Sequence, residues 1–133
     1  MRQSLLGLER ILGPDHPQTI ECRNNLAWAY ESAGDLTRAI PLYERAVADF
    51  ERVMGPDHPR TAGCRVNLVR VYVSSGDLAR AVPQLKRVVS HLERVLGSDH
   101  PDTLMTRDVL ATTQQWAVGS AAGPTLDEIA DSA

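Results

Sequence analysis

Three copies of an Asp-His pair are the residues in this sequence best suited to chemistry, because a carboxylate and an imidazole can together bind a metal ion or move a proton. The pairs are Asp15-His16, Asp57-His58 and Asp99-His100, each 42 residues after the previous one. If equivalent positions lie in stacked repeats, about 10 Å separates them for each helix packed between, whereas the ligands of one zinc ion all lie about 2 Å from it. We therefore expect no metal site, and we interpret Asp or His as the cap of a helix that begins at the following proline.

Two cysteines, Cys22 and Cys64, are also 42 residues apart. A nucleophilic thiol needs a neighbouring base, and neither cysteine has a histidine beside it in sequence. Two cysteines do not make a disulfide framework, and the first ten residues meet charge too soon for the core of a signal peptide. We expect both to be reduced packing residues of a cytoplasmic protein.

Other signals of catalysis or cofactor binding are missing from the sequence. It contains no Gly-x-Gly-x-x-Gly, no phosphate-binding loop and no His-Glu-x-x-His. The net charge is −3, whereas a nucleic-acid-binding protein normally has a basic face. No run of about twenty apolar residues is present to cross a membrane. We expect neither catalysis nor a cofactor, and we expect partners other than nucleic acid or membrane.

A 42-residue repeat positions all of these residues. Residues 13–17, Gly-Pro-Asp-His-Pro, return at 55–59 and, as Gly-Ser-Asp-His-Pro, at 97–101. Other positions keep the same phase: Thr19, Thr61 and Thr103; Arg23, Arg65 and Arg107; Leu26, Leu68 and Leu110. A fixed period of this length is typical of a protein built from stacked structural repeats.

Each repeat is predicted to contain two helices. The first runs from about Pro17 to Ala33, with apolar residues at helical spacing, and Gly34-Asp35 ends it and caps the next. The second runs from about Leu36 to Met54, and Gly55-Pro56 ends it. The expected fold is therefore all-α, with six main helices in antiparallel pairs.

The residues of the first repeat resemble a known family. Leu26-Ala27-x-x-Tyr30-x-x-x-Gly34-x-Leu36-x-x-Ala39-x-x-x-Tyr43-x-x-Ala46 is similar to the signature of the tetratricopeptide repeat (TPR), in which small residues lie where two helices cross. The period and the Gly-Pro-Asp-His-Pro loop resemble the kinesin-light-chain subclass. This resemblance implies an α-α superhelix, the TPR solenoid. The second repeat has Val69 and Val88 where small residues are usual, which predicts looser packing there.

The domain boundaries follow from the repeat. We expect a TPR solenoid over residues 1–118, with full repeats at about 17–58 and 59–100 and half repeats at 1–16 and 101–118. Residues 119–133 are rich in Gly, Ala and Ser and then acidic, which indicates a flexible acidic tail.

The same resemblance implies a peptide-binding groove, because the first helices of a TPR stack line its concave face. The register of Leu26, Leu68 and Leu110 assigns to this groove Asn24, Asn25, Trp28, Glu31, Val66, Asn67, Arg70, Asp108 and Thr112. Trp and Arg are enriched at binding hot spots, and a side-chain amide can both donate to and accept from a peptide backbone. Asn25 and Asn67 have an alternative role, which is to hold neighbouring repeats in register. The carboxylate clamp of chaperone-binding TPR domains needs Lys at positions 24 and 66, so the sequence disfavours that partner class.

The sequence thus predicts a protein-interaction module that binds a peptide or a partner helix in its concave groove. One alternative is a structural scaffold that forms a homo-oligomer, because the terminal half repeats leave apolar surfaces unpaired. A second alternative is the sensor repeat region of a larger bacterial signalling ATPase.

Overall fold

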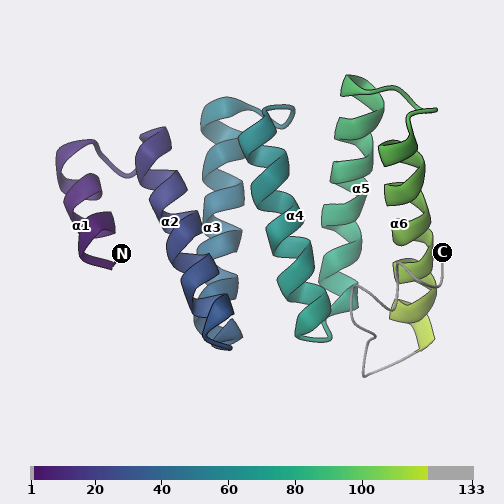
Figure 1. Cartoon of the computed structure of the whole chain (residues 1–133), viewed down its shortest axis with the longest axis horizontal. Helices are drawn as coiled ribbons and strands as arrows, with labels where there is room; N and C mark the ends of the chain where they lie inside the picture. Colours follow the sequence, from purple (N-terminus) through teal and green to yellow (C-terminus); the bar gives the residue numbers. More distant parts are fainter. Residues whose placement is uncertain (1, 120–133) are drawn as a thin grey trace. The chain divides into compact units, whose positions relative to one another are not determined.

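The computed structural model describes residues 2–119, and over these its only regular secondary structure is helix (Figure 1). Its helices are α1 (Arg2–Ile11), α2 (Pro17–Ser32), α3 (Leu36–Met54), α4 (Pro59–Ser74), α5 (Leu78–Val95) and α6 (Pro101–Gly119). The prediction of an all-α fold with six helices is confirmed. The predicted tail lies outside the described residues from position 120 onward, and residue 119 is the last residue of α6. None of the described helices is long and apolar enough to cross a membrane.

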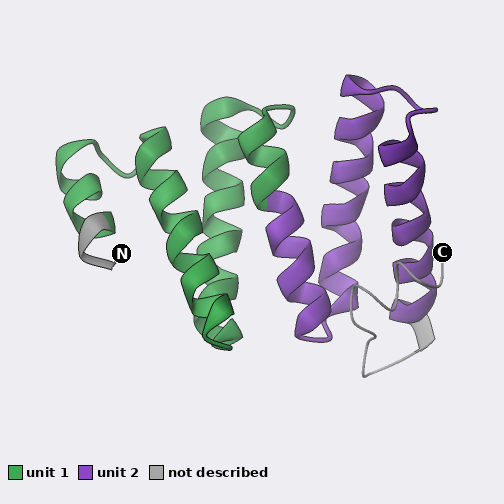
Figure 2. Ribbon diagram, viewed as in Figure 1, with its two compact units in different colours: residues 1–64 green, residues 65–133 purple. Residues whose placement is uncertain are grey.

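The chain divides into two compact units, residues 1–64 and 65–133, with the boundary inside α4 (Figure 2). In unit 1, α2 packs against both α1 and α3. In unit 2, α5 packs against α6. Each unit thus contains pairs of helices that are neighbours in sequence, which is the arrangement that a stacked repeat requires.

The turn between the two helices of a repeat is built by Gly and Asp. Gly34 has a φ of +81°, which a residue with a Cβ rarely adopts. The main-chain N–H of Asp35 then donates to the carbonyl of Tyr30 over 2.9 Å, which closes the end of α2. The Asp35 carboxylate accepts from the N–H of Arg38 over 3.2 Å and begins α3. Residues 76–77 repeat this geometry between α4 and α5, so the predicted turn chemistry is confirmed at both places.

The three histidines of the Asp-His pairs cap helices. The Nδ1 atoms of His16, His58 and His100 each accept, over 3.1 Å, the main-chain N–H two residues further on. Asp15 has a different role, since its carboxylate accepts from Arg52 of α3 over 2.7 Å. Over the described residues, no three His, Cys, Asp or Glu side chains gather as a metal site would require.

The core of unit 1 combines apolar side chains with one buried charge. Its apolar residues with no exposed surface are Ile20, Ala27, Ala39, Tyr43, Ala46 and Phe50. Arg23 lies among them at 1% exposure, and its guanidinium donates to Glu9 over 3.2 Å and to Asp49 over 3.0 Å. Because a buried charge is costly unless it is paired, these contacts tie α1 and α3 to α2. They thereby hold α2, which carries the first candidate site.

Candidate functional site

The exposed side of α2 carries an aromatic side chain beside an amide. Trp28 is 56% exposed, although its type is usually buried in a small domain. Asn25, one turn earlier, is exposed as well, and its amide has no hydrogen-bond partner among the described residues. An indole and an amide on one helical face offer a ligand both apolar surface and a donor–acceptor pair.

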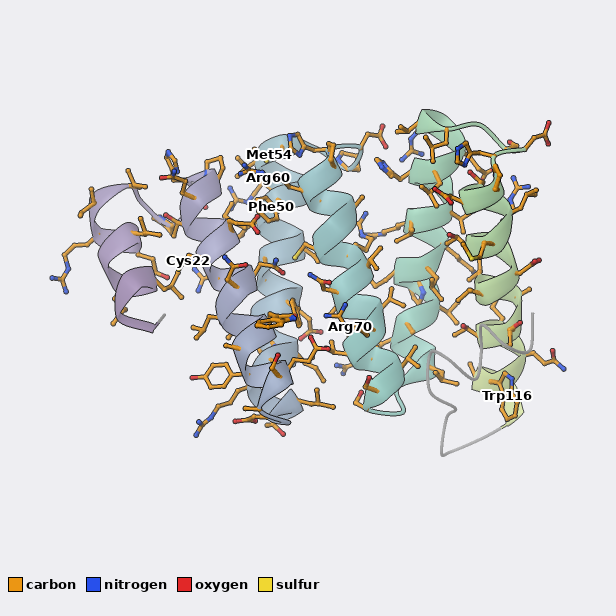
Figure 3. All side chains as sticks on the ribbon, viewed as in Figure 1. Cys22, Phe50, Met54, Arg60, Arg70 and Trp116 are labelled. Atoms are coloured by element: carbon orange, nitrogen blue, oxygen red, sulfur yellow. The ribbon has the colours of Figure 1, made fainter. Side chains whose placement is uncertain are left out.

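A depression of about 510 Å³ adjoins Asn25 in unit 1. It is lined by Leu8, Gln18, Glu21, Cys22, Asn25 and Arg60. Figure 3 shows two of these residues, Cys22 on α2 and Arg60 in the first turn of α4. The lining contains a carboxylate, a guanidinium and two amides, so it can form hydrogen bonds with the main chain of an extended peptide.

Sequence reasoning found part of this depression. Gln18, Cys22 and Asn25 lie at helical spacing on α2. Extending the predicted groove positions toward the start of this helix would therefore have added Gln18 and Cys22. Leu8 and Arg60 come from α1 and α4. No spacing along the sequence indicates that these two residues approach α2.

Two predicted groove residues of α2 have partners within unit 1. Asn24 is half-buried, and its Oδ1 accepts from the thiol of Cys64 over 3.2 Å. Glu31 is also half-buried and accepts from the hydroxyl of Tyr43 over 2.8 Å. Both contacts join α2 to another helix, so these side chains stabilise the scaffold in addition to any contact with a ligand. Cys64 is buried, as expected of a packing residue.

In unit 2 the predicted site residues come from α4 and α6. Val66 is exposed, whereas Asn67 and Arg70 are half-buried. The guanidinium of Arg70, labelled in Figure 3, donates to the Oδ1 of Asn67 over 3.0 Å within the same helix. On α6, Asp108 is exposed and Thr112 is half-buried. The hydrogen bond of the Asn67 side chain is therefore made with a residue of its own helix, α4.

An apolar hollow of about 200 Å³ lies in unit 2. It is lined by Val66, Val69, Leu85, Val88, Met105, Thr106 and Val109. Val69 and Val88 are the residues that replace the usual small ones, and looser packing was predicted at these positions. Both valines are buried, and both line this hollow. The open side of the hollow can receive one apolar side chain.

The charges nearest the start of α2 form an exposed pair. The side-chain hydrogen bond from Arg52 holds the pKa of the Asp15 carboxyl below its usual value. The same bond, together with one to Asp49, raises the pKa of Arg52 above the ordinary value for arginine. Both side chains are more than half exposed, so solvent screens this pair. It fixes the loop to α3 and lies outside the depression.

Comparisons with known proteins agree with the sequence and the fold. A family model described as a tetratricopeptide repeat matches residues 19–60 and 61–102. Among solved structures, the chain is similar to the nearly identical TPR-like repeats of a Podosopora anserina protein described as a kinesin light chain, with 30% sequence identity and a TM-score of 0.76. The match covers 89% of this chain but only 56% of that one. Comparison with curated protein sequences gives no match. The predicted resemblance to kinesin-light-chain repeats is thus confirmed.

Proposed function

Because the chain belongs to the tetratricopeptide-repeat family, whose repeats generally act as protein-interaction modules, we propose that it binds a peptide or a partner helix on the exposed side of its first helices. This fold is typically non-catalytic, and the proposed mechanism is surface complementarity on a rigid scaffold. The observation that carries the proposal is the exposed indole of Trp28 beside the unpartnered amide of Asn25.

The exposed indole leaves substantial apolar surface for a partner to cover. A Trp side chain buries roughly 150–250 Å² when fully enclosed, so one that is 56% exposed leaves about 100 Å² accessible. At about 25 cal/mol per Å², covering that surface contributes about 2–3 kcal/mol to binding. This magnitude is typical of a binding hot spot.

The amide beside the indole favours binding over a scaffold role. An asparagine that holds repeats in register would be buried and hydrogen-bonded to a neighbouring helix. Asn25 has neither property within the described part of the chain. It adjoins a depression that also contains Glu21 and Arg60, so a bound main chain would find donors and acceptors there.

Unit 2 supports the proposal with a contact of a different kind. Val66 opens onto the apolar hollow, and Arg70 lies one turn later on the same face of α4. An apolar side chain of a ligand fits the hollow, and a carbonyl or carboxylate fits the guanidinium.

A displayed peptide library tests the proposal directly. We expect selection on the purified chain to enrich peptides that bind the wild type and lose most of their affinity for Trp28→Ala. Val53→Ala is the matched control, because Val53 is an exposed apolar side chain on α3, a second helix of the repeat. Enriched peptides that bind both variants as well as the wild type would show that the ligand uses another surface.

A further inference from the structure

The last described helix exposes positions that are fully covered in the first repeat. Leu104 of α6 is 47% exposed, whereas Ile20, its equivalent in α2, has no exposed surface. Ala111 is likewise exposed, and its equivalent Ala27 has no exposed surface. In unit 1, α2 is packed between α1 and α3, and in unit 2, α6 packs against α5. Leu104 and Ala111 therefore mark an exposed stripe of α6, on the side where a second helix of the repeat would lie.

The first helix of the chain is of the type that would fit this stripe. Residues 8–10 of α1, Leu-Glu-Arg, match Phe-Glu-Arg at 50–52 in α3 and Leu-Glu-Arg at 92–94 in α5. Since α3 and α5 are the second helices of their repeats, α1 is a second helix as well. The chain thus carries a second helix in one half repeat and a first helix in the other.

We propose that a second copy of this chain covers α6 with its own α1, so that two molecules associate head to tail. In this contact, α6 of one molecule and α1 of the next form the same kind of helix pair that α2 and α3 form within unit 1. The contact completes the split repeat and covers Leu104 and Ala111. It is independent of the peptide-binding proposal, which concerns a different side of the first helices.

Charge complementarity between the two half repeats supports this choice of occupant. Within unit 1, Arg52 of the second helix pairs with Asp15 of the loop before the first helix, over 2.7 Å. The 42-residue repeat makes Arg10 the equivalent of Arg52, and Asp99 the equivalent of Asp15 in the third copy of the loop. Both are exposed, and neither has an ion-pair partner within residues 2–119. Packing α1 of one molecule on α6 of another brings these two charges together.

This association differs from a symmetric dimer in a measurable way. A head-to-tail contact joins two different surfaces. An open assembly of any size therefore keeps one uncovered α1 at one end and one uncovered α6 at the other. The assembly therefore grows with concentration or closes into a ring. A symmetric α6–α6 dimer would stop at two copies.

Two variants that each block one surface test the proposal. Leu104→Asp places a charge on the α6 stripe, and Arg10→Asp places like charges at the proposed ion pair. We expect sedimentation velocity to show wild-type assemblies that grow with concentration or reach the fixed size of a ring, while each variant alone sediments as the 14.6 kDa monomer. A 1:1 mixture of the variants should form a heterodimer and nothing larger, since only one intact surface remains on each molecule. Lys86→Asp, a charge reversal at an exposed position of α5, should assemble like the wild type.

A charge swap covers the case in which a single variant folds poorly. The double variant Arg10→Asp with Asp99→Arg restores opposite charges, so it should regain the assemblies of the wild type. Three results would overturn the proposal: a wild type that stays monomeric at all concentrations, a mixture that forms no heterodimer, or a Leu104→Asp variant that assembles alone.

Discussion

The buried arginine of unit 1 leads to a sharp stability prediction. Asp49 contacts three guanidinium groups: Arg23 at 3.0 Å, Arg52 at 3.0 Å and Arg45 at 3.7 Å. Asp49→Ala leaves the guanidinium of Arg23, which is 1% exposed, with Glu9 as its remaining carboxylate. Removing one partner of a fully buried pair costs about 3–5 kcal/mol. Because Glu9 remains and the Asp49 side chain is 15% exposed, we expect about 2–4 kcal/mol here.

Urea denaturation followed by circular dichroism measures this loss. Arg45→Ala is the matched control, because it removes an exposed partner of the same carboxylate and should cost less than about 0.5 kcal/mol. Asp49→Asn should fall between the two, since the amide oxygen can still accept a hydrogen bond from Arg23. If Asp49→Ala unfolds at the same urea concentration as Arg45→Ala, the Arg23 pairing does not hold unit 1 together.

Three further predictions concern the backbone, the pH response and the thiols. Gly34→Ala should destabilise the chain by about 1–2 kcal/mol, because Gly34 has a positive φ. Gly63→Ala should stabilise the chain by about 0.5–1 kcal/mol, because Gly63 lies within α4 and an added Cβ would meet no other atom. Denaturant midpoints distinguish these two outcomes. Because Asp15 has a lowered folded-state pKa, its contribution to stability is present above its ordinary value of 3.8 and is lost as the pH falls through the folded-state value. The wild type should thus melt above Asp15→Asn near neutral pH, and thermal melts at decreasing pH should show this difference disappearing. A thiol reagent should label half-exposed Cys22 in the folded chain and buried Cys64 only after unfolding, and an equal rate at both would contradict the packing of α4.

Much of the fold could be predicted because its signals are local. The glycine and aspartate at 34–35 end one helix and begin the next through contacts that span at most five residues. The histidine caps span two residues, so residue order alone indicates them. Because the sequence repeats, each local prediction made for one repeat also applies 42 residues later.

The candidate site was predictable only where helical register decides it. Register placed Trp28 and Val66 on an open face, and both are exposed. It could not show that Asn24 contacts Cys64, because that contact depends on the distance between two helices. The same limit applies to Asp15. The sequence offered Asp or His as the cap, and it could not show that Asp15 pairs with a side chain 37 positions away.

The most direct test of the binding proposal is a nuclear magnetic resonance titration of the labelled chain with a peptide from the library selection. The chain has two tryptophans, Trp28 and Trp116, so the indole N–H signals are few and simple to assign. The proposal predicts that the indole signal of Trp28 and the side-chain amide signals of Asn25 shift in proportion to bound peptide. Unchanged signals at both residues, together with shifts of main-chain amides along α3, would contradict it and place the ligand on a second helix of the repeat.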